Sequence, residues 1–346
     1  MTFVCQCDMG RERKSNFELL RIISMLMIVM HHLAVHGGAV VTDASPAFSV
    51  AVLHFFDLGG KLAVNAFVLI SGYFLVKSKF KPEKLFALIV EIFIYSTTIY
   101  FIFVSLGKVK FEWKALVYSF LPLSTNGYWF MTCYVLMYLV SPLVNIVLRH
   151  STQKMHIALI LIMFFICSIV PLYSDHILSD TAWFIFLYVT AAYIALYPQV
   201  FEKKWVFVVA STALYLVIVL FKLFVHVSLD KMDNPICYLC SVSMFIMFKN
   251  MKIKFNSIIN FVSSATLGVY LIHDNNYIRP FIWHDVFKIG EMFKSNDFWW
   301  KAIFVVIIVF IAGVVIDVLR RLILKFFDLF VDYNILSKKQ GNFLHL

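Results

Sequence analysis

The chain has 346 residues, of which 62% are hydrophobic and only 14% are charged, and its formal net charge is +10. Soluble domains carry about 25% charged residues, so this composition excludes a protein whose whole surface faces water. The basic residues lie in short loops between apolar runs, a pattern typical of membrane topology and not of nucleic-acid binding. We therefore expect an all-α, polytopic integral membrane protein.

Apolar runs divide the chain into about ten predicted transmembrane helices, since a crossing helix needs about 20 apolar residues. In chain order they lie at 17–35, 61–76, 85–106, 128–148, 155–173, 181–197, 204–225, 235–250, 257–273 and 298–325. Residues 48–58 are expected to form a half-helix before the short second span, and residues 111–121 an amphipathic or re-entrant segment. With no internal repeat or linker, residues 1–346 are predicted to form one membrane-embedded domain.

The distribution of charge predicts which loops face the cytoplasm. Lys and Arg gather before the first span, in the even-numbered loops and after the last span, whereas most acidic residues lie in the odd-numbered loops. Cytoplasmic loops of membrane proteins collect Lys and Arg. The N-terminal segment 1–16 and the tail 326–346 are therefore both predicted to be cytoplasmic.

The first span holds the densest set of ionisable residues, a feature that often marks a functional site in a membrane. Arg21 and His32 are separated by eleven residues, or about 1100° of helical rotation, so they share one face about 16 Å apart along the axis. Glu18 precedes Arg21 by three residues and can pair with it. His31 points about 80° away from the Arg21 line, which favours a structural role. The polar face formed by Glu18, Arg21 and His32 also has a structural interpretation. In it, the arginine extends to the membrane–water interface with its glutamate, and the histidine is bonded to a neighbouring helix.

Other polar residues in the spans give weaker signals. Glu91, Lys222 and Asp317 are interpreted as helix–helix contacts or interfacial groups, and His273 is either interfacial or functional. The loop after the second span contains four lysines, which form either a solvated cytoplasmic loop or a phosphate-binding patch: Lys77, Lys79, Lys81 and Lys84. Cys237 and Cys240 form a CxxC without a second pair or a histidine at zinc spacing, so buried thiols are favoured over a metal site.

Four segments, taken together in order and spacing, carry a family resemblance. They are Phe17–Arg21 followed by His32; Asn65–Phe74; Tyr128–Phe130 followed by Tyr134, Tyr138 and Pro142; and Ser264–His273. The chain resembles the membrane acyltransferase-3 family of bacterial O-acyltransferases, which modify surface polysaccharides. It departs from the family pattern at Glu18, where aspartate is commoner, and at Lys81 and Lys84, where the family has Arg-x-x-Arg.

The resemblance implies a reaction and a place in the cell. An acyl group, most often acetyl, would pass from cytoplasmic acyl-coenzyme A to a sugar hydroxyl of a cell-surface or exported glycan, free or lipid-linked. Acetyl-coenzyme A would be a co-substrate, and no permanently bound cofactor or metal is expected. The expected partners are acyl-coenzyme A, the glycan and membrane lipids, without nucleic acid, in the bacterial plasma (inner) membrane.

The resemblance also implies residue roles. His32 would be the general base or carry a transient acyl group, and Glu18 would hold Arg21. Phosphates of the coenzyme would bind Arg21, Lys81 and Lys84. The remaining candidates would line the substrate cavity: Asn65, Ser71, Tyr73, Trp129, Tyr270 and His273.

Two other functions fit a multi-span chain with buried charge: a proton-coupled transporter and a non-catalytic subunit of a glycan-export complex. A transporter more often has helices broken by Gly or Pro in matching halves. The twelve glycines of this chain show no such symmetry, so the acyltransferase is favoured.

Overall fold

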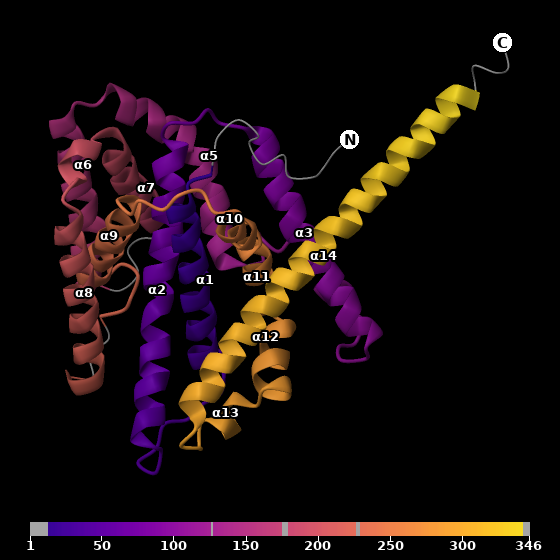
Figure 1. The fold of residues 1–346 in the computed structure, drawn as a ribbon, viewed down its shortest axis with the longest axis horizontal. Coiled ribbons are helices and arrows are strands. Elements are labelled where there is room, and N and C mark those ends of the chain that lie inside the picture. Colours follow the sequence, from indigo (N-terminus) through magenta and orange to yellow (C-terminus); the bar gives the residue numbers. More distant parts are fainter. Residues whose placement is uncertain (1–12, 126, 175–178, 226–228, 342–346) are drawn as a thin grey trace.

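The structure is a computed structural model that describes residues 13–125, 127–174, 179–225 and 229–341. All regular secondary structure in these ranges is helical, which confirms the all-α prediction (Figure 1). Within the described residues, seven helices are long and apolar enough to cross a membrane, and three shorter apolar helices occupy the remaining predicted spans. The chain is therefore a polytopic helical membrane protein.

The helices follow the order of the predicted spans. Their bounds are α1 Ser15–His36, α2 Ala47–Leu75, α3 Pro82–Ser105, α4 Trp113–Phe120, α5 Trp129–His150, α6 Gln153–Phe164, α7 Asp180–Leu196, α8 Lys204–Leu220, α9 Pro235–Lys249, α10 Ser257–Ser264, α11 Thr266–His273, α12 Ile278–Pro280, α13 Ile289–Met292 and α14 Phe298–Gly341. Short π- or 3₁₀-helical turns extend α6, α8 and α12.

The second span differs from its prediction, because residues 48–58 do not form a separate half-helix. They are the first turns of α2, a continuous helix of 29 residues. Two glycines in its middle do not break it, since they serve close packing with α1. A Cβ atom on Gly60 would lie 2.3 Å from Cγ of His31, so only glycine permits this approach.

The ninth span also differs from the prediction. Residues 257–273 divide at Ala265 into α10 and α11, where hydroxyl groups compete for backbone carbonyls. Ser264 Oγ donates to the Phe261 carbonyl and Thr266 Oγ1 to the Ser263 carbonyl. The tenth span agrees with the prediction, since the apolar part of α14 covers Phe298–Phe326, and the helix continues beyond it to Gly341.

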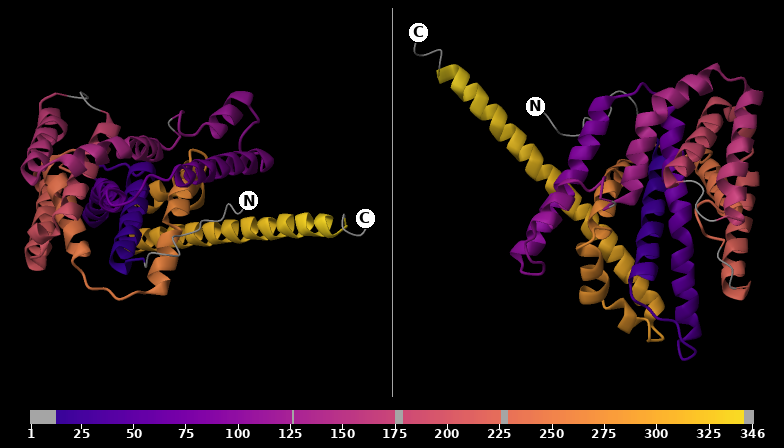
Figure 2. Two further views of the ribbon diagram at one scale, coloured as in Figure 1. Left: turned by 90° about the horizontal axis from the view of Figure 1, so that it is seen from above. Right: turned by 180° about the vertical axis from the view of Figure 1, so that it is seen from behind.

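The bundle is centred on the antiparallel pair α1 and α2, which loop 37–46 joins at one end (Figure 1). Helices α7 and α9 pack against α2, and α10, α11 and α14 contact α1. Seen from two other sides, α14 passes obliquely along α11 and extends away from the bundle (Figure 2). This arrangement brings the end of α11 against the second half of α1, where the candidate site lies.

Candidate active site

The polar face of α1 begins with an ion pair near the helix start. Arg21 Nη1 lies 2.7 Å from Glu18 Oε1, as their three-residue spacing predicts. Ser263 Oγ, at the end of α10, donates to the other oxygen of Glu18 at 2.5 Å. Glu18 is therefore held on both sides, and it orients the Arg21 guanidinium.

Deeper in the bundle, His32 meets a second histidine that is 241 residues away in the sequence. His32 Nδ1 lies 2.9 Å from His273 Nε2, and His273 Nδ1 lies 2.6 Å from the backbone carbonyl of Val269. Both imidazoles are buried. Three groups on α1 and α11 thus form one hydrogen-bonded chain.

This chain determines the tautomer of each neutral imidazole. A carbonyl oxygen can only accept, so His273 Nδ1 must carry the proton that it donates to Val269. The Nε2 atom of His273 is then an acceptor, and His32 Nδ1 must donate to it. His32 Nε2 is left with a free lone pair, which is the state that a general base requires.

A carboxylate stands beside this pair. Asp274 Oδ1 lies 3.6 Å from His32 Nδ1, so it can stabilise an imidazolium form of His32. Asp274 is itself paired with Arg279 Nη1 at 3.2 Å. Asp274 ends the predicted ninth span together with His273, but it was not among the site residues predicted from the sequence.

Aromatic hydroxyls hold or face the same segment. Tyr128 Oη donates to the Leu271 carbonyl at 2.8 Å and accepts from Asn275 Nδ2 at 2.8 Å, which fixes the turn that carries His273. The Tyr270 hydroxyl is buried and makes no hydrogen bond of ordinary geometry among the described residues, although it lies close to the Asp274 carboxylate. An unpaired buried hydroxyl costs free energy, so this group suits an incoming polar ligand.

His31 is occupied elsewhere, in agreement with the structural role expected from its direction. Its Nδ1 lies 2.7 Å from the carbonyl and 3.1 Å from Oδ1 of Asp57 on α2. Lys222 Nζ bonds the other oxygen of Asp57 at 2.8 Å. These contacts tie α1 and α2 to the π-helical turn that follows α8.

The other predicted cavity residues divide into two groups. Asn65 is fully buried, donates to the Met232 carbonyl at 2.9 Å and accepts from Trp183 Nε1 at 2.9 Å, so its amide serves contacts between helices. Trp129 begins α5, and the ammonium of Lys61 lies 4.9 Å from its ring centroid. Lys61 was missed by the sequence analysis, although it is the only charged residue of the predicted second span.

The two residues near the C-terminal end of α2 make simpler contacts. Ser71 Oγ donates to the carbonyl of Phe67 on its own helix at 2.9 Å. The ring of Tyr73 stacks on Phe17 with a centroid distance of 5.2 Å. Both lie at the level of the Glu18–Arg21 pair and not at the level of the two histidines.

The lysine loop precedes α3 at the same end of the bundle as the start of α1 (Figure 1). The side chains of Lys81 and Lys84 are both exposed. The backbone N–H of Lys81 donates to Tyr138 Oη at 3.4 Å, which connects the loop to α5. The loop is therefore exposed at the end of the bundle where α1 starts.

Three side chains near the histidine pair have the spacing of a metal site. His32, His36 and Asp274 each offer one ligand atom, and these atoms lie within 4.8 Å of one another. A metal on His32 Nδ1 would replace its bond to His273, so the two uses compete.

Cys237 and Cys240 are both buried, and Cys240 Sγ lies 3.6 Å from the Ser211 carbonyl.

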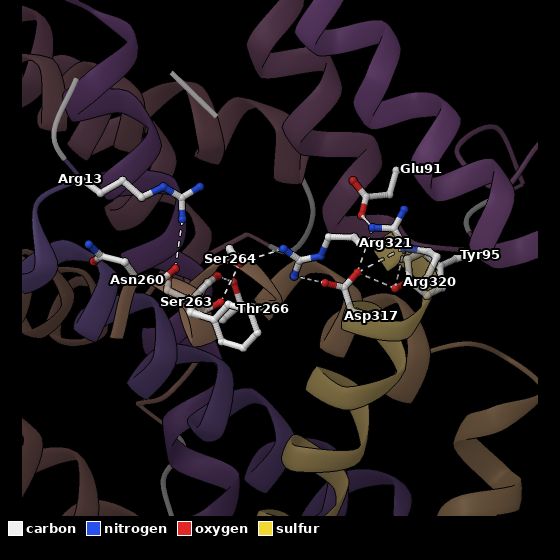
Figure 3. Close-up of polar contacts among 11 residues, drawn as sticks. Arg13, Glu91, Tyr95, Asn260, Ser263, Ser264, Thr266, Asp317, Arg320 and Arg321 are labelled. Atoms are coloured by element: carbon white, nitrogen blue, oxygen red, sulfur yellow. Dashed lines mark hydrogen bonds and ion pairs between the residues drawn. The ribbon is translucent and has the colours of Figure 1, made fainter. Parts of the chain in front are cut away.

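A second polar cluster joins α3, α10 and α14 (Figure 3). It is adjacent to the Glu18–Arg21 pair, because Ser264 accepts from Arg321 while the preceding Ser263 donates to Glu18. Asp317 pairs with Arg320 at 2.9 Å and also with Arg321, and it accepts from Tyr95 Oη at 2.7 Å. Arg320 also pairs with Glu91. The prediction that Glu91 and Asp317 join helices is thus confirmed.

Comparison with known proteins adds a family assignment. Residues 14–318 match the family described as acyltransferase domain, and this range includes every site residue predicted from the sequence. No curated protein and no solved structure matches the chain.

Proposed function

This chain belongs to the acyltransferase family that its residues 14–318 match, and from this premise we propose that it acylates a glycan. The donor is acyl-coenzyme A, with acetyl as the acyl group, and the acceptor is a sugar hydroxyl of a cell-surface or exported glycan. The chain is a membrane acyltransferase, and its place is the bacterial plasma membrane with both termini in the cytoplasm.

One observation carries the proposal: the hydrogen bonds from Val269 through His273 to His32 leave His32 Nε2 unprotonated. This nitrogen takes the proton of the sugar hydroxyl while the oxygen attacks the thioester carbonyl carbon. The C–S bond then breaks, the new ester C–O bond remains, and the proton passes from His32 to the thiolate. The products are the acylated sugar and free coenzyme A.

Two further residues support the charges that develop in this reaction. Protonated His32 gains a positive charge, and Asp274 at 3.6 Å stabilises it. The tetrahedral intermediate carries a negative oxygen, for which the unpaired hydroxyl of Tyr270 is a suitable donor. His273 acts through His32 as a positioning residue.

The coenzyme is proposed to approach from the other end of α1. Arg21 lies about 16 Å from His32 along the helix axis, and Lys81 and Lys84 lie at the same end of the bundle as the start of α1. Cationic groups there suit the coenzyme phosphates. The long flexible arm of the coenzyme would place its thioester beside His32.

The test is a thioester assay on the purified protein in detergent. Acetyl-coenzyme A and glycan from a deletion strain are added together, free thiol is measured, and the glycan is examined by NMR for a new O-acetyl signal. We expect thiol release that depends on the glycan and on His32. A protein that releases no thiol and leaves the glycan unchanged would contradict the proposal.

A further inference from the structure

Lys61 occupies an unusual place for a cation. It lies at the midpoint of α2, which extends from Ala47 to Leu75, so it is about 21 Å from either end of the helix. Charged residues at such a depth are costly and usually functional. The reaction described above does not use Lys61.

The contacts of Lys61 include no counter-charge. Its ammonium lies over the Trp129 ring, which offers a cation–π attraction but no negative charge. Asp57 is one turn away on α2, but its carboxylate is bound by Lys222 at 2.8 Å and His31 at 3.1 Å. Within the described part of the chain, no carboxylate oxygen lies within 4.0 Å of Lys61 Nζ.

Lys61 and Trp129 lie beside the histidine pair. Trp129 directly follows Tyr128, which is bonded to Leu271 and Asn275 on either side of His273. Lys61 directly follows Gly60, which packs against the His31 ring, and the rings of His31 and His32 have centroids 5.8 Å apart. An anion held by Lys61 would therefore be close to the reacting hydroxyl.

We propose that Lys61 and Trp129 form a subsite for an anionic group of the acceptor glycan, a carboxylate or a phosphate. This inference rests on the proposed function. The donor does not supply such an anion here, because its acyl group is neutral and its phosphates are assigned to the opposite end of α1. An ammonium group forms charge-assisted hydrogen bonds with either anion, and the Trp129 ring offers an apolar surface beside it.

The test compares acceptors that differ only in charge. Glycan from a deletion strain is assayed unmodified, after chemical reduction of its carboxyl groups, and after removal of its phosphates. We expect one of the two treatments to raise the KM for glycan about 10- to 100-fold, the factor expected from losing one charge-assisted hydrogen bond. The effective treatment identifies the anion.

The variant Lys61→Gln should raise the KM for the unmodified glycan by a similar factor and show no further loss with the modified glycan. Lys61→Arg keeps the charge and should retain the preference for the anionic glycan. The matched control is Lys301→Gln, because Lys301 also lies over a tryptophan ring, at 5.8 Å from the Trp300 centroid, but is paired with Asp297. The Lys301→Gln control should leave kcat and the KM for the glycan unchanged.

An unchanged KM for acetyl-coenzyme A in Lys61→Gln shows that the variant is folded. If the unaltered protein acylates all three glycans equally, or if Lys61→Gln lowers activity by the same factor on all of them, the anionic subsite is wrong while the proposed function stands. If the unaltered protein transfers no acyl group to any glycan, the proposed function fails, and this inference fails with it.

Discussion

Two hydrogen bonds connect His32, the proposed base, to a backbone carbonyl that determines which of its ring nitrogens carries the proton. The Val269 carbonyl sets the tautomer of His273, and His273 sets the tautomer of His32. No carboxylate is needed to orient the base, although Asp274 is close enough to stabilise its protonated form. The adjacent His31 has the same chemistry but is bound to Asp57, so only one of the two neighbours is available.

The first prediction separates these two histidines. General-base assistance contributes about 10²–10⁴-fold, so His32→Ala should lower kcat on that scale. His31→Ala should lower the unfolding temperature, because it leaves Asp57 without one partner. It should reduce kcat far less than His32→Ala does. The measurements are acetyl transfer and thermal unfolding in detergent. His32→Gln keeps a hydrogen-bonding group without a base, and full activity of this variant at normal expression would disprove the assignment.

The second prediction concerns the unpaired hydroxyl of Tyr270. Removing one donor to a developing oxyanion costs about 10²–10³ in kcat, so Tyr270→Phe should lose activity on this scale while the ring packing is kept. Tyr238→Phe is a matched control, since its hydroxyl is also buried but bonds Thr190 at 3.0 Å between α7 and α9. Equal kcat values for the two variants would argue against a role for Tyr270 in the reaction.

The third prediction tests the coenzyme site at the start of α3. Changing Lys81 and Lys84 together to Gln should raise the KM for acetyl-coenzyme A more than it lowers kcat, because the interaction is the same in the ground and transition states. The same change at Lys252 and Lys254, two exposed lysines in another loop predicted to be cytoplasmic, is the control. An unchanged KM in the double variant of Lys81 and Lys84 would indicate that these lysines contribute to membrane topology alone.

At the scale of helices, the site depends on how closely α11 approaches α14. Gly268 faces the side chain of Asp317, and a Cβ atom there would lie 2.6 Å from Asp317 Cβ. Asp317 is fixed by Arg320, Arg321 and Tyr95 (Figure 3), so it cannot easily move away. The position of His273, five residues after Gly268, thus depends on this crossing.

The fourth prediction follows from that crossing. Gly268→Ala should overpack the interface at a cost of about 1–3 kcal/mol, which lowers the unfolding temperature and also kcat through displacement of His273. Val315→Ala, on the exposed face of α14, should change neither quantity appreciably. A Gly268→Ala protein of unaltered stability and activity would show that the contact is less tight than its geometry implies.

At the scale of the whole molecule, the fifth prediction concerns sidedness. The loop after α2 lies at the end of the bundle where α1 starts (Figure 1), whereas α7 starts near the middle of α2, since Trp183 in its first turn bonds Asn65. In a background without native reactive thiols, a cysteine at Ser179 should react with an impermeant maleimide from outside the cell, and one at Ser78 should not. The reverse labelling pattern would invert the predicted topology.

The sequence by itself determined where the helices of this protein lie along the chain. It determined little about which residues of different helices are in contact. Apolar runs predict helices because lipid offers no partners for backbone polar groups, and the pairing of Glu18 with Arg21 follows from local spacing. The full length of α2 and the break between α10 and α11 at Ala265 were not predicted, because both depend on contacts with neighbouring groups. Only the tertiary structure showed the contacts of His32 with His273 and of Lys61 with Trp129. These residues are distant in sequence, and they meet because their helices cross, which the periodicity of a sequence does not encode.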